Sequence, residues 1–180
     1  MKALRFTSPG AASRFGLKGR GAANWLAAHA LPVPEAPNTW AGAGPADDAG
    51  ILVARLGAAE FFLEEAAAGS ALRGIDPGST PPGSGVYPVL REDAAYSLSG
   101  QGASDVLAQV CNVNFADLNL DPHPVIMTSM IGVSVLVIPQ DSGSERIYRI
   151  WCDPTFGTYL GESLRMVVSE CGGNNMGVSA

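Results

Sequence analysis

The sequence carries one motif twice, and the two copies are 81 residues apart. Residues 15–27 and residues 96–108 both read aromatic-x-Leu-x-Gly-x-Gly-Ala-x-x-apolar-Leu-Ala. Self-similarity at a fixed spacing indicates that each half of the chain folds into the same supersecondary unit. The repeat therefore limits the chain to folds that contain two related modules. Three pairs of residues share the spacing: Gly19 and Gly100, Gly21 and Gly102, and Asn38 and Asn119.

Each copy of the motif predicts a short strand, a turn and a helix. The alternation of Phe15 and Leu17, and of Tyr96 and Leu98, is typical of a strand with one buried face. The Gly-x-Gly pair predicts a turn, because glycine adopts positive φ without a steric penalty. The residues after the turn have the i, i+3, i+4, i+7 spacing of one helix face. These residues are Ala22, Trp25, Leu26 and His29 in the first copy and Ala103, Val106, Leu107 and Val110 in the second.

After the first motif, the sequence predicts a strand and a second helix. Residues 51–56 form an apolar run that favours a strand. The Ala-rich stretch around residues 59–68 favours a helix. The side chains of this helix include Phe61, Phe62 and Leu63, with Glu64 and Glu65 on its solvated face.

After the second motif, the sequence predicts a hairpin and a final helix. Strands at residues 130–138 and 146–151 are joined by a turn at residues 139–144. Asp153 and Pro154 form a helix start signal, because aspartate caps the first turn and proline suits the first helical position. The predicted apolar face of this helix is Phe156, Tyr159, Leu160, Leu164, Val167 and Val168.

Together these elements predict an α+β protein built from two tandem β-α-β-β-α modules. This order is typical of a ferredoxin-like arrangement with a mainly antiparallel sheet. Aligning the last helix of each half pairs Leu63 with Leu160, so that the hairpin gives the second module about 16 more residues. The predicted boundaries are a first module at 1–73, a Pro-, Gly- and Ser-rich linker at 74–88, a second module at 89–171 and a disordered tail at 172–180.

The composition predicts a protein partner and argues against nucleic acid and membranes. Hydrophobic residues make up 47% of the chain and charged residues only 16%, so apolar surface is expected to be covered by another polypeptide. The net charge is −6, and the densest basic stretch is Arg14, Lys18 and Arg20. Phosphate backbones and anionic lipid surfaces both require a positive field. Three cysteines without C-x-x-C spacing and an N-terminus without an apolar signal core indicate a cytoplasmic location.

No constellation for catalysis, cofactor binding or metal binding is predicted. Both Gly-x-Gly turns lack the third glycine of a dinucleotide-binding loop, which makes a nucleotide- or flavin-dependent enzyme improbable. His29 falls on a helix stripe, where a packed histidine is the simpler interpretation. Cys111 and His123 would share a metal only if the fold brought them together, and a free cysteine is mostly a small buried hydrophobe. The sequence contains no G-x-S-x-G nucleophile elbow.

Four residues are candidates for a partner interface. Trp40 follows a Pro-rich segment and the repeated Asn38, and tryptophan is enriched at interface hot spots, although a core position is equally open for it. His123 lies between Pro122 and Pro124, which make a stiff extended loop that can present a side chain rigidly. Tyr87 lies at the end of the predicted linker. Trp25 and Trp151 are expected in the core.

Several segments resemble the gamma subunits of heterotetrameric sarcosine oxidase over most of the chain. In the first half these are residues 16–26, Leu31-Pro32-Val33-Pro34 and Pro37-Asn38-Thr39-Trp40. In the second half they are residues 91–100 with the following helix and the ending at residues 149–160. The family is related to folate-binding domains of the aminomethyltransferase type.

The resemblance implies an accessory subunit that stabilises an amine N-demethylating oxidoreductase and carries no catalytic residues. Larger catalytic subunits are the expected partners. Flavin and tetrahydrofolate are then expected in those partners and not in this chain. Related complexes, such as an N-methylglutamate dehydrogenase or a methylamine-type monooxygenase, stay open. The alternative is a tetrahydrofolate-binding, aminomethyltransferase-like protein that acts alone, which would need an acidic residue for the pterin ring and an enclosed pocket.

Overall fold

The computed structural model describes residues 3–9, 12–43, 50–65, 72, 75, 84–143 and 145–175. The chain divides into two compact units. The small unit is Ala11–Glu92, and the large unit combines Met1–Gly10 with Asp93–Ala180. The N-terminal segment therefore belongs with the second half of the chain.

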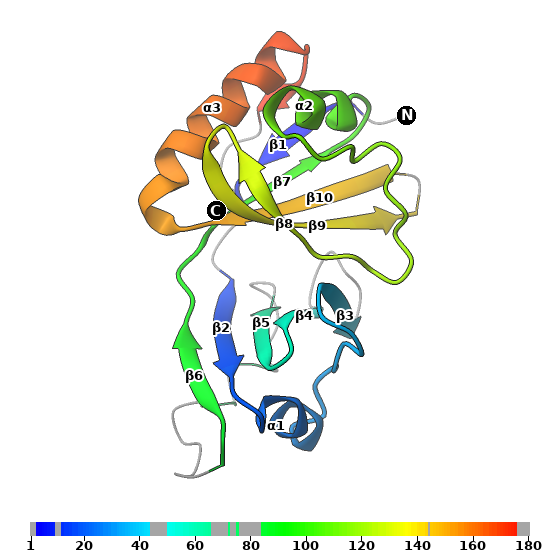
Figure 1. The fold of residues 1–180 in the computed structure, drawn as a ribbon. Helices are drawn as coiled ribbons and strands as arrows, with labels where there is room; N and C mark the ends of the chain where they lie inside the picture. The colour runs from blue at the N-terminus through cyan, green and yellow to red at the C-terminus, as the bar shows by residue number, and fades with distance from the viewer. Residues whose placement is uncertain are drawn as a thin grey trace. The chain divides into compact units, whose positions relative to one another are not determined.

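The small unit is a five-stranded sheet with the strand order β3-β4-β5-β2-β6, and every neighbouring pair in it is antiparallel. Figure 1 shows these strands and the short helix α1. The elements are β2 (Ser13–Lys18), α1 (Ala22–Ala28), β3 (Thr39–Ala43), β4 (Ile51–Gly57), β5 (Glu60–Glu65) and β6 (Tyr87–Leu90). The apolar core of the unit includes Leu17, Leu26, Val53, Phe61 and Leu63.

The turn between β2 and α1 needs glycine at its first position. Gly19 has φ 111°, and a Cβ atom there would lie 2.1 Å from the carbonyl oxygen of Gly85. The Gly19 N–H donates to the Ala59 carbonyl (2.9 Å), and the Gly21 N–H donates to Gly85 (3.0 Å). The first Gly-x-Gly turn is thus a structural turn between a strand and a helix.

The large unit is a six-stranded sheet with the order β11-β1-β7-β10-β9-β8. Its strands pair antiparallel except for β1 and β11, which are parallel. Helices α2 and α3 pack on one face of the sheet (Figure 1), where their buried side chains share a core with the strands. The elements are β1 (Arg5–Thr7), β7 (Ala94–Ser99), α2 (Ala103–Val110), β8 (Ile126–Met130), β9 (Val133–Ser142), β10 (Glu145–Cys152), the 3-10 helix η3 (Pro154–Phe156), α3 (Gly157–Glu170) and β11 (Asn174–Asn175).

Helix α3 begins at the predicted signal and lies close against β7. Asp153 caps η3 by accepting the Thr155 N–H at 2.9 Å. The Tyr96 hydroxyl donates to the Gly157 carbonyl at 2.5 Å. A Cβ atom on Gly161 would lie 2.8 Å from the same hydroxyl oxygen. Glycine at this position therefore lets the helix approach the tyrosine ring.

The two sheets share one strand order, and each takes in a strand from the other half of the sequence. The order β3-β4-β5-β2-β6 corresponds to β8-β9-β10-β7-β1. β1 precedes β2 in the chain but pairs with β7. β6 precedes β7 but pairs with β2. The leading strand of each half thus completes the sheet of the other half.

The α+β class and the mainly antiparallel sheets are confirmed, whereas the ferredoxin-like duplication is not. The helix predicted around residues 59–68 is wrong in its described part, because residues 60–65 form strand β5. Residues 58 and 59 make a tight turn after β4, and both faces of β5 are buried, which a one-sided helix pattern does not capture. The order β-α-β-β-β is therefore shared by β2 to β5 and by β7 to β10, with α3 and β11 following β10. Leu63 on β5 is not the counterpart of Leu160 on α3.

Three further predictions differ from the structure. The strand predicted at residues 130–138 is two strands, because Ile131 and Gly132 form a turn with positive φ between β8 and β9. The predicted linker at 74–88 ends inside β6, and residues 76–83 lie outside the described part. Of the tail predicted as disordered, Asn174 and Asn175 pair with β1, and residues 176–180 are not described.

Candidate functional site

The four predicted interface residues are divided between the two units. Trp40 lies on β3 and Tyr87 on β6, which are the opposite edges of the small sheet. Asn38 immediately precedes β3 and is exposed. His123 is exposed in the loop between α2 and β8 of the large unit. Trp40 is partly buried and Tyr87 is 65% exposed.

Asn38 belongs to a connection that an arginine of β4 holds in place. Asn38 has φ 59°, and its N–H donates to the Arg55 carbonyl at 2.7 Å. The Arg55 guanidinium donates to the carbonyls of Pro34 (3.2 Å), Glu35 (2.8 Å) and Ala58 (2.7 Å). Charge-assisted hydrogen bonds of this kind are stronger than neutral ones. The segment before Trp40 is thus fixed by β4.

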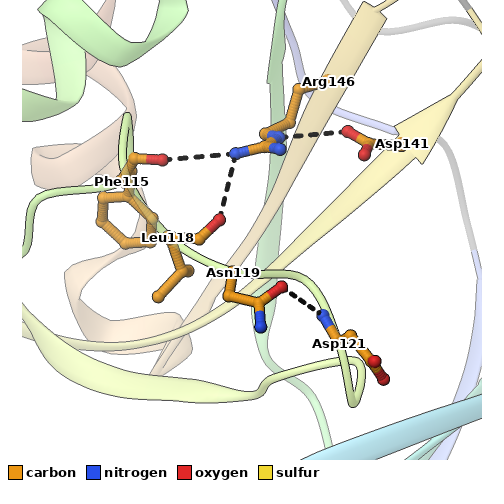
Figure 2. A network of polar contacts seen from close by, with 6 residues as sticks. All are labelled: Phe115, Leu118, Asn119, Asp121, Asp141 and Arg146. Atoms are coloured by element: carbon orange, nitrogen blue, oxygen red, sulfur yellow. Dashed lines mark hydrogen bonds and ion pairs between the residues drawn. The ribbon is translucent and has the colours of Figure 1, made fainter.

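The loop that carries His123 is anchored in the same manner. Figure 2 shows Arg146 of β10 donating from Nε to Asp141 (3.0 Å) and from Nη1 to the carbonyls of Phe115 and Leu118 (3.5 Å each). The Phe115 ring packs edge-on against Tyr148. A long loop without secondary structure of its own is commonly functional. This loop is held rigidly at its centre while its His123 end is exposed.

The strand β5 carries two buried carboxylates that the sequence prediction placed on a solvated helix. Glu64 and Glu65 are 2% and 1% exposed. Glu64 forms an ion pair with Arg14 of β2, directly across the sheet. Glu65 accepts the Leu72 N–H at 2.9 Å. Each of the two carboxyl groups thus has a hydrogen-bonding partner within the small unit, as buried polar groups require. Both side chains are buried because both faces of strand β5 are covered. The alanine-rich composition of the segment favoured a helix and therefore did not predict this burial.

The exposed apolar side chains gather on α3. Of the six large hydrophobic residues that are exposed in the described part, three lie on η3 and α3: Phe156 (51%), Tyr159 (52%) and Met166 (63%). The predicted apolar face is correct for Leu160, Leu164 and Val168, which are buried. It is wrong for Phe156 and Tyr159, which are about half exposed, and the Tyr159 hydroxyl donates to the Ile131 carbonyl in the β8–β9 turn at 3.4 Å. An i, i+3 pattern shows helix faces but not which apolar face is covered.

The titratable groups near β10 are poor nucleophiles. Burial, followed by the charges of Asp153 and Asp93, raises the pKa of the Cys152 thiol. Burial likewise raises the pKa of Tyr96 and of Tyr148. A cysteine reacts as the thiolate, so a raised pKa leaves Cys152 unreactive at neutral pH. Hydrogen bonds from Thr155 lower the pKa of Asp153 and keep it charged.

The structure also places the other residues that the sequence analysis considered as metal ligands or as core residues. Cys111 is buried and lies 3.7 Å from the Thr128 hydroxyl, whereas His123 is exposed. Within the described ranges, no three His, Cys, Asp or Glu residues gather as a metal site would require. No helix in the same part of the chain is long and apolar enough to cross a membrane. Trp151 is in the core at 1% exposure, and Trp25 is partly buried with its ring stacked on His29.

The fold is shared with two solved structures. A chain of heterotetrameric sarcosine oxidase from Corynebacterium sp. U-96, solved in complex with pyrrole 2-carboxylate, matches with a TM-score of 0.66 and 24% identity. The match covers 96% of this chain and 86% of that chain. The glycine cleavage system aminomethyltransferase T from Bartonella henselae matches with a TM-score of 0.67 and 14% identity over 98% of this chain. This chain spans 48% of the length of that aminomethyltransferase.

The comparisons therefore establish a fold. No protein-family model matches the sequence, and no curated protein matches it. The sequence identity of both structural matches is so low that a shared fold does not imply a shared function. The sarcosine oxidase chain is matched over most of its own length, whereas the aminomethyltransferase is matched over half of it.

Proposed function

We propose that this chain is a small structural subunit of a hetero-oligomeric, sarcosine oxidase-like oxidoreductase that N-demethylates an amine. The observation that carries the proposal is the match to a chain of heterotetrameric sarcosine oxidase over 96% of this chain and 86% of that one. Two chains that match over nearly their whole lengths agree in domain content as well as in fold. The segments at residues 16–26 and 149–160, which resemble gamma subunits, point the same way.

The distribution of side chains supports a binding role over a catalytic role. The two carboxyl groups that are buried in β5 already have partners, Glu64 in Arg14 and Glu65 in the Leu72 N–H. Cys152, the buried thiol nearest to a helix start, has a raised pKa. Three large apolar side chains on η3 and α3, Phe156, Tyr159 and Met166, are exposed, as expected of a surface that a partner covers. In this proposal the larger partner subunits hold flavin and tetrahydrofolate, and this chain holds neither.

Co-expression with the products of neighbouring genes tests the proposal. The expected result is a stable complex by size-exclusion chromatography, in which the flavin absorbance and the amine oxidation remain with the larger subunits. Omitting this chain should lower the yield of the assembled complex. The complex that still forms should oxidise the amine. A chain that elutes as a monomer in the presence of those subunits contradicts the proposal.

The second candidate is a stand-alone tetrahydrofolate-binding protein of the aminomethyltransferase type. The observation that favours it is the TM-score of 0.67 to aminomethyltransferase T. Recognition of the pterin requires a carboxylate that is available inside a pocket. The buried carboxylates Glu64 and Glu65 do not fit this role, because each already accepts hydrogen bonds from the protein.

A titration of the purified chain with tetrahydrofolate separates the two candidates. Trp25 and Trp40 report on the small unit and Trp151 on the large unit. The structural-subunit proposal expects no saturable change in tryptophan fluorescence for the chain alone. A saturable change in tryptophan fluorescence upon addition of tetrahydrofolate would favour the folate-binding candidate.

A further inference from the structure

Helix α3 of the large unit carries an apolar stripe that the unit itself leaves exposed. Phe156, Tyr159 and Met166 follow one another at i, i+3 and i+10, which places them along one side of the helix. Each is more than half exposed, and the Tyr159 hydroxyl donates to the Ile131 carbonyl of the β8–β9 turn at 3.4 Å. Leu160 and Leu164 are buried against the strands. The helix thus carries buried and exposed apolar side chains, and its own sheet covers only the buried set.

The exposed charged residues of α3 beside this stripe are acidic. Glu162 lies four residues before Met166 and Glu170 four residues after it, so both lie beside Met166 on the helix surface, and both are exposed. Asp153 is exposed at the N-terminal end of the stripe. The basic residue of the helix, Arg165, is partly buried with its guanidinium over the Phe6 ring, 5.8 Å from the centroid. The outward side is therefore apolar at its centre and acidic at its rim.

We infer that this outer face of α3, made of Phe156, Tyr159 and Met166 with Glu162 and Glu170 at its rim, docks into an apolar groove with a basic rim on a larger subunit of a different sequence. This inference rests on the proposed function and names the surface through which the chain joins the complex. An amphipathic helix that lays an apolar stripe into a groove is a recurrent mode of protein recognition. The acidic rim selects a partner of opposite charge.

A second copy of this chain fits the surface less well. In a twofold dimer the same patch lies on both sides of the interface. Pairing α3 with α3 would bring Glu162 and Glu170 close to the same residues of the other copy, and the chain as a whole carries a net charge of −6. Like charges placed opposite each other disfavour association. The partner is accordingly a chain with lysine or arginine around its groove.

The test compares two methionines of similar exposure in the co-expressed complex. Met166→Lys places a charge at the centre of the stripe, and Met127→Lys places the same charge on β8, where Met127 is 55% exposed. We expect Met166→Lys to raise the dissociation constant for the neighbouring gene products by ~10-fold or more, as for a disrupted hot spot, and Met127→Lys to leave it unchanged. Equal binding by both variants and by the wild-type chain overturns the inference.

A second pair of variants tests the basic rim. Glu162→Lys and Glu170→Lys together should slow association and remove its salt dependence, because rim charges act mainly on the association rate. Glu92→Lys, an exposed change in the small unit, is the control. Hydrogen exchange on the wild-type complex should show protection of residues 156–170 upon assembly. Absence of that protection in an assembled complex also refutes the inference.

The outcomes separate this inference from the proposed function. If the wild-type chain assembles and the α3 variants assemble equally well, the proposed function stands and the docking surface lies elsewhere. If the wild-type chain does not assemble, the proposed function fails and the inference fails with it. If the isolated chain forms a dimer that Met166→Lys dissociates, the stripe binds a second copy and the choice of partner is wrong.

Discussion

The small and large units share a strand order but differ in what covers their sheets. In the large unit β10 leads through η3 into α3, which packs beside α2 on the same face. In the small unit β5 leads into residues 66–71, outside the described part, and α1 covers the core together with Leu72 and Ile75. Among the residues that the structure describes, two sheets of the same strand order therefore carry different helices. Helix α3, which has no counterpart in the described part of the small unit, brings both buried side chains and the exposed stripe.

The largest expected difference between the units concerns their ion pairs. Glu64→Ala leaves Arg14, whose side chain is 12% exposed, without its carboxylate in the small sheet. Removing one partner of a buried pair costs ~3–5 kcal/mol, and we expect a loss of this size in the free energy of unfolding measured with urea.

The matching change in the large unit is Glu145→Ala, which breaks the pair between Glu145 and Arg5. The Arg5 side chain is 35% exposed, so that water can solvate the remaining charge, and the loss should be smaller than for Glu64→Ala. Equal losses of unfolding free energy would mean that the deeper burial of the Arg14–Glu64 pair does not increase its contribution to stability.

The next largest effect concerns the helices. Leu26 on α1 and Leu164 on α3 are 0% and 1% exposed, and Leu→Ala in a packed core costs ~2–5 kcal/mol. We expect both Leu26→Ala and Leu164→Ala to lower the unfolding free energy within this range. Chemical denaturation followed by circular dichroism measures the effect.

Met127→Ala serves as the exposed control for these two changes, with an expected effect within ~0.5 kcal/mol. A loss for Leu164→Ala as small as that of the control would show that α3 contributes little to the core of the large unit.

A smaller effect is expected at the arginines that hold the two α-to-β connections. Arg55→Ala removes hydrogen bonds to Pro34, Glu35 and Ala58, and Arg146→Ala removes those to Phe115 and Leu118. Hydrogen bonds from a charged donor contribute ~1.5–3 kcal/mol.

The Arg55 bonds are shorter, at 2.7–3.2 Å, than the 3.5 Å Arg146 bonds, so Arg55→Ala should be the more costly change. Hydrogen exchange should accelerate in residues 31–38 for Arg55→Ala and in residues 112–124 for Arg146→Ala. Acceleration in neither segment would show that the arginines do not hold these connections.

The smallest effect is a dependence on pH in the alkaline range. Cys152 has an ordinary pKa of 9.0 that burial raises in the folded state. Above pH 9 the unfolded chain loses this proton more readily than the folded chain, so the unfolding free energy falls as pH rises. Cys152→Ala should reduce the slope of the unfolding free energy against pH. An unchanged slope in Cys152→Ala would assign the alkaline loss to other groups such as Tyr96 and Tyr148.

The repeated motif predicts the elements whose formation depends on residues that are close together in the sequence. The strand, the Gly-x-Gly turn and the helix of each copy are present at β2–α1 and β7–α2, because alternation, positive φ and a helix stripe leave signatures within about 13 residues. The start of the last helix at Asp153 and Pro154 is equally local.

The prediction fails where distant segments decide the structure. The run from Phe61 to Glu65 is a strand because β4 and β2 pair on its two sides, and its own composition favours a helix. The pairing of β1 with β7 leaves no trace in either segment alone. The same holds for the surface on α3, since the sequence shows two apolar sides of a helix and not which of them is covered.

The exchange of leading strands has a consequence for the order in which the protein is made. The segment Arg5–Thr7 is synthesised well before its neighbours, because Ser97–Ser99 and Asn174–Asn175 follow it in the chain by roughly 90 and 170 residues. Strand β1 can therefore pair with both of its neighbours only after β11 has been made. The sheet of the large unit is thus closed late, by two segments that are far apart in the chain and adjacent in the sheet.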